Sequence, residues 1–235
     1  MSFAPPVQNA ATVILVRSGA AGGMEVLMNR RPAGMHFLGG FYVFPGGSVK
    51  PEDYAESVLN RCPGLSPAQA HRLLGGTLRP DVSLGHWVAG IREVFEETGI
   101  LLCHDQSGKS VETQRKHLRE KRARLLDRAM SFQSFLESEE MLCDVAHMAY
   151  FSHWQTPEEF STRFNTRFYL ALLPDDQLPI PSSREVAETL WLSPDQALIL
   201  CRQGKLPLIF PTYASLRTLA DFDSLDSLCA EYHLR

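Results

Sequence analysis

Three glutamates gather near the end of the stretch REVFEETGI, residues 92–100. In a helix, residues three and four apart share a face, so Glu93, Glu96 and Glu97 would lie side by side and repel one another. Gly99 is typical of the residue that ends a helix, and acids at that end are disfavoured by about 0.3–1 kcal/mol each. A divalent cation held by carboxylate oxygens would offset both effects. A solvated acidic face is the alternative, because like-charged pairs at this spacing cost only about 0.2–0.5 kcal/mol.

The elements that must position these acids follow from the apolar pattern. Residues 87–98 predict a helix, since Trp87, Ile91 and Val94 recur at helical spacing. Short apolar and β-branched runs predict strands over residues 11–17, 24–30, 41–44, 100–103, 145–154, 166–173 and 185–193. Two helices are predicted after the last of these, over residues 194–203, begun by Ser193 and Pro194, and over residues 212–222.

Two further segments are also predicted to be helical. Residues 51–86 predict short helices cut by prolines and glycines, and residues 110–142 predict a strongly helical segment. The second segment carries an apolar stripe at Leu118, Leu125, Ala129, Phe132 and Leu136. We see no internal repeat and no linker, so the pattern predicts one domain of the α/β (α+β) class spanning residues 1–235.

Composition excludes several classes of function. The chain has 235 residues, 44% hydrophobic and 21% charged, with a net charge of −4, which favours neither a nucleic-acid nor a membrane partner. The N-terminal apolar run lacks a basic region before it and predicts a strand, not a signal peptide. The five cysteines are scattered and form no CxxC pair, which argues against disulfides or zinc and favours a cytoplasmic location.

The acidic stretch also has an upstream partner. PGGSVKPED, residues 45–53, followed by REVFEETGI resembles the signature of the Nudix hydrolases: a glycine, an acid six residues later, a spacer, then Arg-Glu-apolar-x-Glu-Glu-x-Gly-apolar. Asp53 stands where the family usually has Glu. The spacer departs from the pattern, because 38 residues separate Asp53 from Arg92 where the usual signature has seven. Residues 54–86 are therefore identified as an insertion within the signature, with residues 110–142 as additional helices.

A signature split in this way resembles one subgroup, the mitochondrial or peroxisomal acyl-coenzyme A diphosphatases and their bacterial relatives. An upstream element of coenzyme A diphosphatases is also partly matched, at Leu27, Arg31, Gly40 and residues 44–47. Three positions depart from that element, with Asn29 for Thr, Pro32 for Ser and His36 for Arg. Coenzyme A is thus suggested as substrate without being established by this motif.

The resemblance implies a Nudix fold, a mixed sheet sandwiched between helices, and a set of site residues. Mg²⁺ or Mn²⁺ would be held by Glu93, Glu96, Glu97 and the backbone carbonyl of Gly46. Arg92 would orient the glutamates, with a surface ion pair to Glu96 as the alternative. Asp53 would either pair with Arg92 or cap the helix after Pro51. A later acid would act as base or extra ligand, with Glu185 preferred over Glu188 because it begins the strand beside the loop of residues 181–184.

Substrate contacts are expected from cations, because guanidinium binds phosphate in a bidentate way. The cationic candidates are Arg30 and Arg31 before the signature and Arg163 and Arg167 in the later segment, and Phe44 of the upstream element is a further candidate. Seven lysines and arginines lie between Arg115 and Arg128, and we expect them to form a solvated helical face, with contact to a 3′-phosphate as the alternative.

The sequence therefore predicts a hydrolase that cleaves the diphosphate linkage of a nucleotide derivative, with coenzyme A or acyl-coenzyme A as the leading substrate. An ADP-ribose or NADH pyrophosphatase and a regulator that binds a nucleotide without cleaving it are the alternatives. The expected partner is a small nucleotide-type molecule. The insertion is expected to set the substrate, and the sequence leaves open whether it caps the site, mediates a homodimer or decorates the surface.

Overall fold

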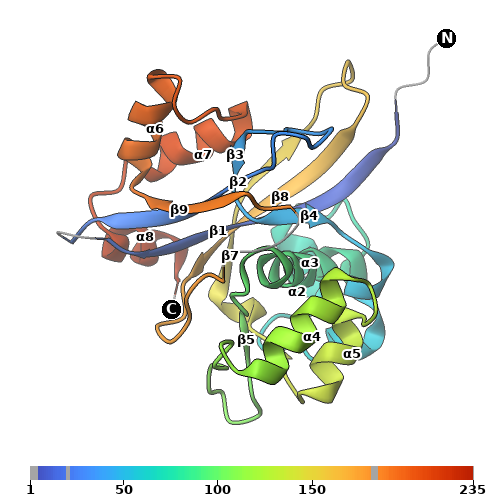
Figure 1. Cartoon of the computed structure of the whole chain (residues 1–235). Helices are drawn as coiled ribbons and strands as arrows, with labels where there is room; N and C mark the ends of the chain where they lie inside the picture. Colours follow the sequence, from blue (N-terminus) through green and yellow to red (C-terminus); the bar gives the residue numbers. More distant parts are fainter. Residues whose placement is uncertain (1–4, 20–21, 181–184, 235) are drawn as a thin grey trace.

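A mixed sheet with helices on both faces forms the centre of the protein (Figure 1). The computed structural model describes residues 5–19, 22–180 and 185–234. The strands lie in the order β3–β2–β1–β8–β7, and β4 and β9 pair with β1 and β2. Their bounds are β1 Val7–Ser18, β2 Met24–Arg30, β3 Tyr42–Val43, β4 Gly46–Ser48, β7 Met148–Gln155, β8 Arg163–Leu172 and β9 Glu188–Leu192. β1 runs parallel to β8 and antiparallel to β2 and β4, so the predicted mixed sheet is confirmed.

Side chains of β1 and β2 alternate between two hydrophobic cores. Ala11, Val13 and Leu15 are buried with α3 (Pro80–Thr98) on one face of the sheet. Ile14 and Val16 are buried on the other face, with the C-terminal helices α6 (Pro194–Arg202), α7 (Phe210–Leu219) and α8 (Leu225–Tyr232). This period of two explains why residues 11–17 are apolar throughout: a central strand is covered on both faces.

Helix α3 carries the three glutamates and begins earlier than predicted. It starts at Pro80, in the first position of the helix, and ends at Gly99, whose φ of 75° and N–H bond to Phe95 close the last turn. The predicted start at residue 87 was wrong. Gly85 lies just before that residue, and glycine has a low intrinsic helix propensity. In the fold Gly85 is needed, since a Cβ there would lie 2.8 Å from the Cβ of Tyr54.

The insertion is part of the core on the α3 side. It follows η2 (Pro51–Tyr54) and contains α1 (Glu56–Leu59), α2 (Pro67–Leu73) and the start of α3, and α2 packs along α3. Its apolar residues Val58, Cys62, Ala70 and Leu74 are buried in the same cluster as α3. The insertion thus supports the helix that carries the glutamates.

The segment after Gly99 is buried, as predicted, but residues 100–102 are not a strand. The side chain of Gln177 accepts from the N–H of Leu101 (2.7 Å) and donates to its carbonyl (2.9 Å). This side-chain amide thus makes the two backbone hydrogen bonds that a neighbouring strand would make. Only β5 (Cys103–His104) pairs, with β6 (Leu142–Cys143).

The predicted helical segment 110–142 is two helices, α4 (Lys116–Leu126) and α5 (Phe132–Ser138). Its stripe is buried except for Ala129, which lies exposed between them. All five cysteines are free. None of the helices in the described ranges is both long and apolar enough to span a bilayer.

Candidate active site

The last two turns of α3 present Glu93, Glu96 and Glu97 toward β4 and β2. Glu97 is only 5% exposed and Glu93 only 9%, while the side chain of Glu96 is 18% exposed. A solvated acidic face, the alternative from the sequence, is therefore wrong. Three partly or fully buried carboxylates in two turns require compensation by bonds or by cations.

Arg92 joins the two halves of the split signature. Its guanidinium donates to both carboxylate oxygens of Asp53, with Nε–Oδ1 at 2.7 Å and Nη2–Oδ2 at 2.9 Å. Nη1 also donates to Glu93 Oε1 at 2.5 Å and lies 3.5 Å from Glu96. Burial lowers the pKa of Arg92, but the bond to Asp53 and the charge of Glu93 outweigh it and raise that pKa above its ordinary value.

Asp53 fulfils both roles that the sequence left open. Besides its ion pair with Arg92, its Oδ2 accepts from the backbone N–H of Lys50 (2.7 Å), at the start of η2. The side chains of Asp53 and Arg92 are 0% and 1% exposed. The ion pair that Arg92 makes is thus buried, and the surface pair considered from the sequence does not describe it.

Glu97 is held by Asn29 of β2, which the sequence analysis recorded only as a departure from a motif. The Asn29 amide donates to Glu97 Oε2 (3.2 Å), and its carbonyl oxygen accepts from Thr189 Oγ1 (2.9 Å). Burial first, and the charge of Glu93 second, raise the pKa of Glu97 well above its ordinary value. Burial also raises the pKa of Glu96. The signal for Asn29 was a polar residue directly after the apolar run of residues 26–28.

Two glycines of β4 bring the backbone against these acids. A Cβ at Gly46 would lie 2.5 Å from the carbonyl oxygen of Ala11, and one at Gly47 would lie 2.6 Å from the Glu93 carboxylate. The sequence FPGG is thus required by close packing of β4 on β1 and on α3.

Gly47→Ala is expected to displace the Glu93 carboxylate and to lower kcat by about 10²-fold, because a shift of about 1 Å in a catalytic group can have that effect. Steady-state kinetics with Mg²⁺ would measure it. Gly34→Ala is the matched control, since a Cβ at Gly34 meets nothing within 4 Å. Equal activity of both variants would contradict the placement of Glu93 in the site.

Of the two later acids, Glu185 contributes by its charge to the raised pKa of Glu97. Glu188 instead accepts a hydrogen bond from the hydroxyl of Tyr42 (2.7 Å). Glu185 was predicted to begin the strand, but it lies in a turn before β9. The loop of residues 181–184 lies outside the described residues.

The predicted substrate contacts separate into two groups. The charge of Arg31 lowers the pKa of Glu97, and Nε of Arg31 donates to the carbonyl of Phe37 at 3.2 Å. The guanidinium of Arg30 instead lies 5.8 Å from the ring centroid of Tyr42, which belongs to the core on the other face of the sheet. Phe44 lies in that same core and is 3% exposed, so its side chain has almost no accessible surface for the predicted contact with substrate.

The two arginines of β8 are used inside the fold. Arg163 is buried and donates to the carbonyls of Thr156 and Pro5, both at 3.3 Å. Arg167 is also buried, and donates to the carbonyl of Asn165 at 3.3 Å. Neither is brought to the glutamates by any contact of the described residues.

The donors near the end of α3 fit a divalent cation. In the described ranges, no three His, Cys, Asp or Glu side chains form a ready-made metal cluster. Glu97 and Glu96 nevertheless have raised pKa values because of burial and the charge of Glu93, so they favour a bound positive charge. Carboxylate oxygens suit Mg²⁺ and Mn²⁺.

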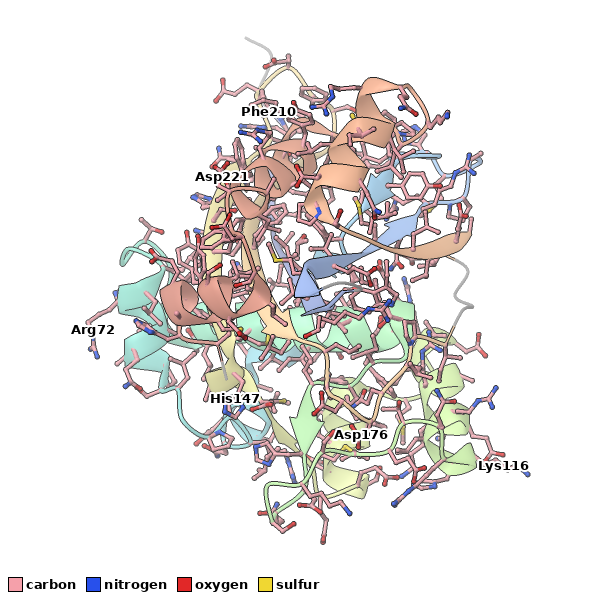
Figure 2. All side chains as sticks on the ribbon, turned by 90° about the vertical axis from the view of Figure 1, so that its left-hand side faces the viewer. Arg72, Lys116, His147, Asp176, Phe210 and Asp221 are labelled. Carbon is pink, nitrogen blue, oxygen red and sulfur yellow. The ribbon has the colours of Figure 1, made fainter. Side chains whose placement is uncertain are left out.

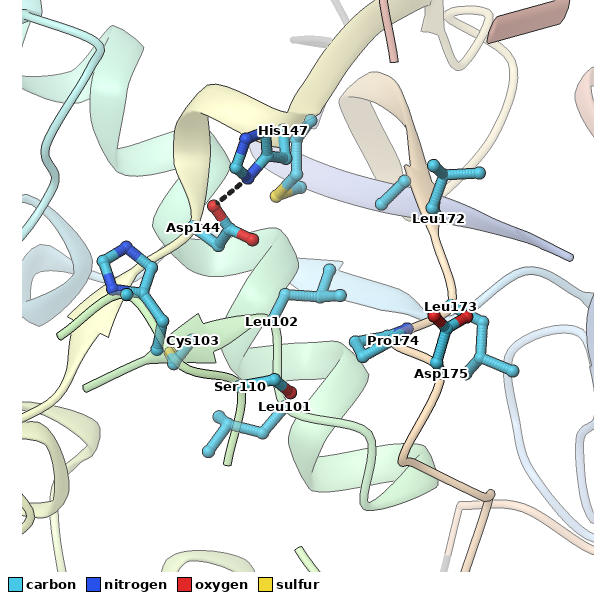
Figure 3. A pocket seen from close by; sticks show the side chains of 14 residues that line it. Leu101, Leu102, Cys103, Ser110, Asp144, His147, Leu172, Leu173, Pro174 and Asp175 are labelled. Carbon is cyan, nitrogen blue, oxygen red and sulfur yellow. Dashed lines mark hydrogen bonds and ion pairs between the residues drawn. The ribbon is translucent and has the colours of Figure 1, made fainter. Parts of the chain in front are cut away.

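A separate cavity of about 280 Å³ lies beyond the C-terminal end of α3 (Figure 3). Leu101, Leu102, Leu172 and Leu173 line it, together with Asp144, whose carboxylate is 2.5 Å from Nδ1 of His147. None of the α3 glutamates lines this cavity, so we do not assign the reaction to it.

Comparison with known proteins agrees with this arrangement. Residues 61–219 match the sequence model of the NUDT19 Nudix domain. The chain is similar to the acyl-coenzyme A diphosphatase NUDT19 of Gallus gallus, with 27% identity over 93% of this chain and 69% of that protein. The Homo sapiens protein of the same name is 26% identical, over 90% of this chain and 64% of its own length.

A solved structure shows the same fold. The crystal structure of a Nudix hydrolase from Alicyclobacillus acidocaldarius superposes with a TM-score of 0.80 at 25% identity, and the match covers 96% of both chains. The fold of this chain is therefore that of a solved Nudix hydrolase over nearly its whole length.

Proposed function

The chain belongs to the NUDT19 Nudix domain family, and from this premise we propose that it is a metal-dependent hydrolase that cleaves the diphosphate linkage of coenzyme A or acyl-coenzyme A. The products are then 4′-phosphopantetheine, or its acyl derivative, and adenosine 3′,5′-bisphosphate. The matched relatives named acyl-coenzyme A diphosphatase support the substrate, although this chain spans only about two thirds of their length.

The observation that carries the proposal is the buried contact between the halves of the split signature. Asp53 and Arg92 are 39 positions apart in sequence, yet they form a bidentate pair beside Glu93. Burial of these two charged groups costs free energy and adds no apolar contact to the core. The placement of the pair beside three carboxylates therefore favours a catalytic role.

In this proposal each residue of the site has a separate task. Glu93, Glu96, Glu97 and the carbonyl of Gly46 hold Mg²⁺ or Mn²⁺, which when bound neutralises phosphate oxygens and lowers the pKa of the attacking water. Arg92 fixes the orientation of Glu93, and Asn29 fixes that of Glu97. Glu185 is the proposed base, and Arg31 the proposed contact of the diphosphate.

A panel of substrates tests this function. Wild-type protein with Mg²⁺ is incubated with coenzyme A, acyl-coenzyme A, NADH, ADP-ribose and dinucleoside polyphosphates, and the products are identified by mass spectrometry. We expect the highest kcat/KM for coenzyme A or its acyl derivatives. Preference for ADP-ribose or NADH would reassign the substrate, and saturable binding without any product would show a regulator.

We also propose the setting in which this activity operates. The buried insertion helices and α3 share one core, which supports a single Nudix domain across the chain. The five free thiols support a reducing compartment such as the cytoplasm. The proposed partner is a small nucleotide-type molecule.

A further inference from the structure

A groove of about 440 Å³ lies between α4 and Ile180. One side carries the cations Lys116, Arg119 and Arg122, and apolar side chains such as Leu126 also line it. Lys116 projects from the start of α4 at the edge of the molecule (Figure 2). This groove therefore combines positive charge with apolar surface.

Both walls of the groove are bonded to the last turn of α3. Arg122 donates to the carbonyl oxygens of Phe95 (2.8 Å) and Glu96 (3.0 Å), and the N–H of Ile180 donates to Thr98 (2.7 Å). Because Glu96 and Glu97 belong to the same turn, the groove adjoins the proposed site of diphosphate cleavage.

The charges of the groove are not balanced within it. Arg119 and Arg122 are three positions apart on α4, so their guanidinium groups lie on the same side of the helix. Glu120 is the acid of the lining, and its carboxylate lies 3.8 Å from the ammonium group of Lys116. An anion in the groove would relieve the repulsion between the two guanidinium groups.

We propose that this groove binds the adenosine 3′-phosphate part of the substrate. The phosphate contacts Arg119 and Lys116, and the adenosine lies against Leu126 and Ile180. This inference rests on the proposed function and deepens it, because the 3′-phosphate distinguishes coenzyme A from dephospho-coenzyme A and from other nucleoside diphosphate derivatives. It also assigns a binding role to part of the basic segment, for which the sequence predicted a solvated face.

The test compares two substrates and two variants. The double variant Lys116→Ala/Arg119→Ala is expected to raise KM for coenzyme A about tenfold, because hydrogen bonds to charged groups are the strong ones. KM for dephospho-coenzyme A should stay within about twofold of wild type. Arg124→Ala is the matched control, since Arg124 is an exposed cation of α4 that does not line the groove.

Equal effects of the double variant on both substrates, or no effect on either, would overturn the subsite. If wild-type protein cleaves neither substrate, the proposed function fails, and calorimetry then tests the groove alone. Adenosine 3′,5′-bisphosphate should bind about tenfold more tightly than AMP to wild type and equally to AMP in the double variant. The absence of this difference would contradict the inference.

Discussion

Glu97→Gln is expected to lower kcat by about 10²–10³-fold in Mg²⁺ without loss of the fold. The substitution removes the negative charge that favours the cation, and metal ions stabilise the transition state by several kcal/mol, of which each 1.36 kcal/mol is a factor of ten in rate. Glutamine keeps an oxygen that can accept from Asn29, so the local packing is preserved. Steady-state kinetics with coenzyme A would measure the loss.

The pH dependence of the stability of Glu97→Gln tests the effect of this residue on folding separately from metal binding. Because burial raises the pKa of Glu97 above 4.5, the folded chain retains this proton at pH values where the unfolded chain has lost it. Stability of the metal-free wild type therefore falls as pH rises from about 4.5 through the raised pKa, and Glu97→Gln should lack this component of the fall.

Thermal unfolding scans with and without Mn²⁺ would complete the comparison. We expect Mn²⁺ to raise Tm of wild type by mass action and to raise Tm of Glu97→Gln much less. An equal rise in both proteins, or full activity of the variant, would show that Glu97 is not a metal ligand.

Asp53→Ala is expected to destabilise the protein by about 3–5 kcal/mol, because removal of one partner leaves the other charge buried and incompletely paired. For a chain of this size the change corresponds to a fall in Tm of about 10 °C. The variant also loses the acceptor for the N–H of Lys50 at the start of η2. Denaturant unfolding followed by circular dichroism would give the free energy of unfolding.

Asp81→Ala provides the matched control for Asp53→Ala. Asp81 pairs with Arg79 at 2.5 Å at the start of α3, but the two side chains are 37% and 70% exposed, so little change in stability is expected. If Asp53→Ala were no more destabilising than Asp81→Ala, the buried pair would not stabilise the connection between the two halves of the signature.

The catalytic elements were largely predictable because they depend on local sequence. The Nudix resemblance and the fold class are confirmed by the family match and by the neighbouring structure. Spacing within one helix was enough to place Glu93, Glu96 and Glu97 on one face. The strand 24–30 and the capped helix after Ser193 were found for the same reason, since period and capping are local properties.

The errors arose where contacts distant in sequence decide the outcome. Residues 100–102 are apolar like a strand, but Gln177, far along the chain, takes the backbone bonds that a strand would have made. The burial of Phe44 and Arg163 was not predictable either, because it depends on packing against segments distant in sequence. The final helix α8, which has eight residues, was not predicted.

The contacts of the insertion and of α4 with α3 could not be predicted, for the same physical reason. The insertion was expected to set the substrate, but its apolar residues are buried beside α3. Arg122 of the basic segment instead reaches the carbonyl of Glu96. Such a capping contact between two helices joins residues 26 positions apart and has no local sequence signal.

Identification of the products formed from coenzyme A by wild-type protein tests the central claim most directly. The reaction is run in ¹⁸O-labelled water with Mg²⁺ and, in parallel, with excess EDTA, and is followed by mass spectrometry. We expect 4′-phosphopantetheine and adenosine 3′,5′-bisphosphate with Mg²⁺, one of them carrying a single ¹⁸O atom, and neither product with EDTA. Intact coenzyme A under both conditions, or equal product formation with EDTA, would contradict the claim.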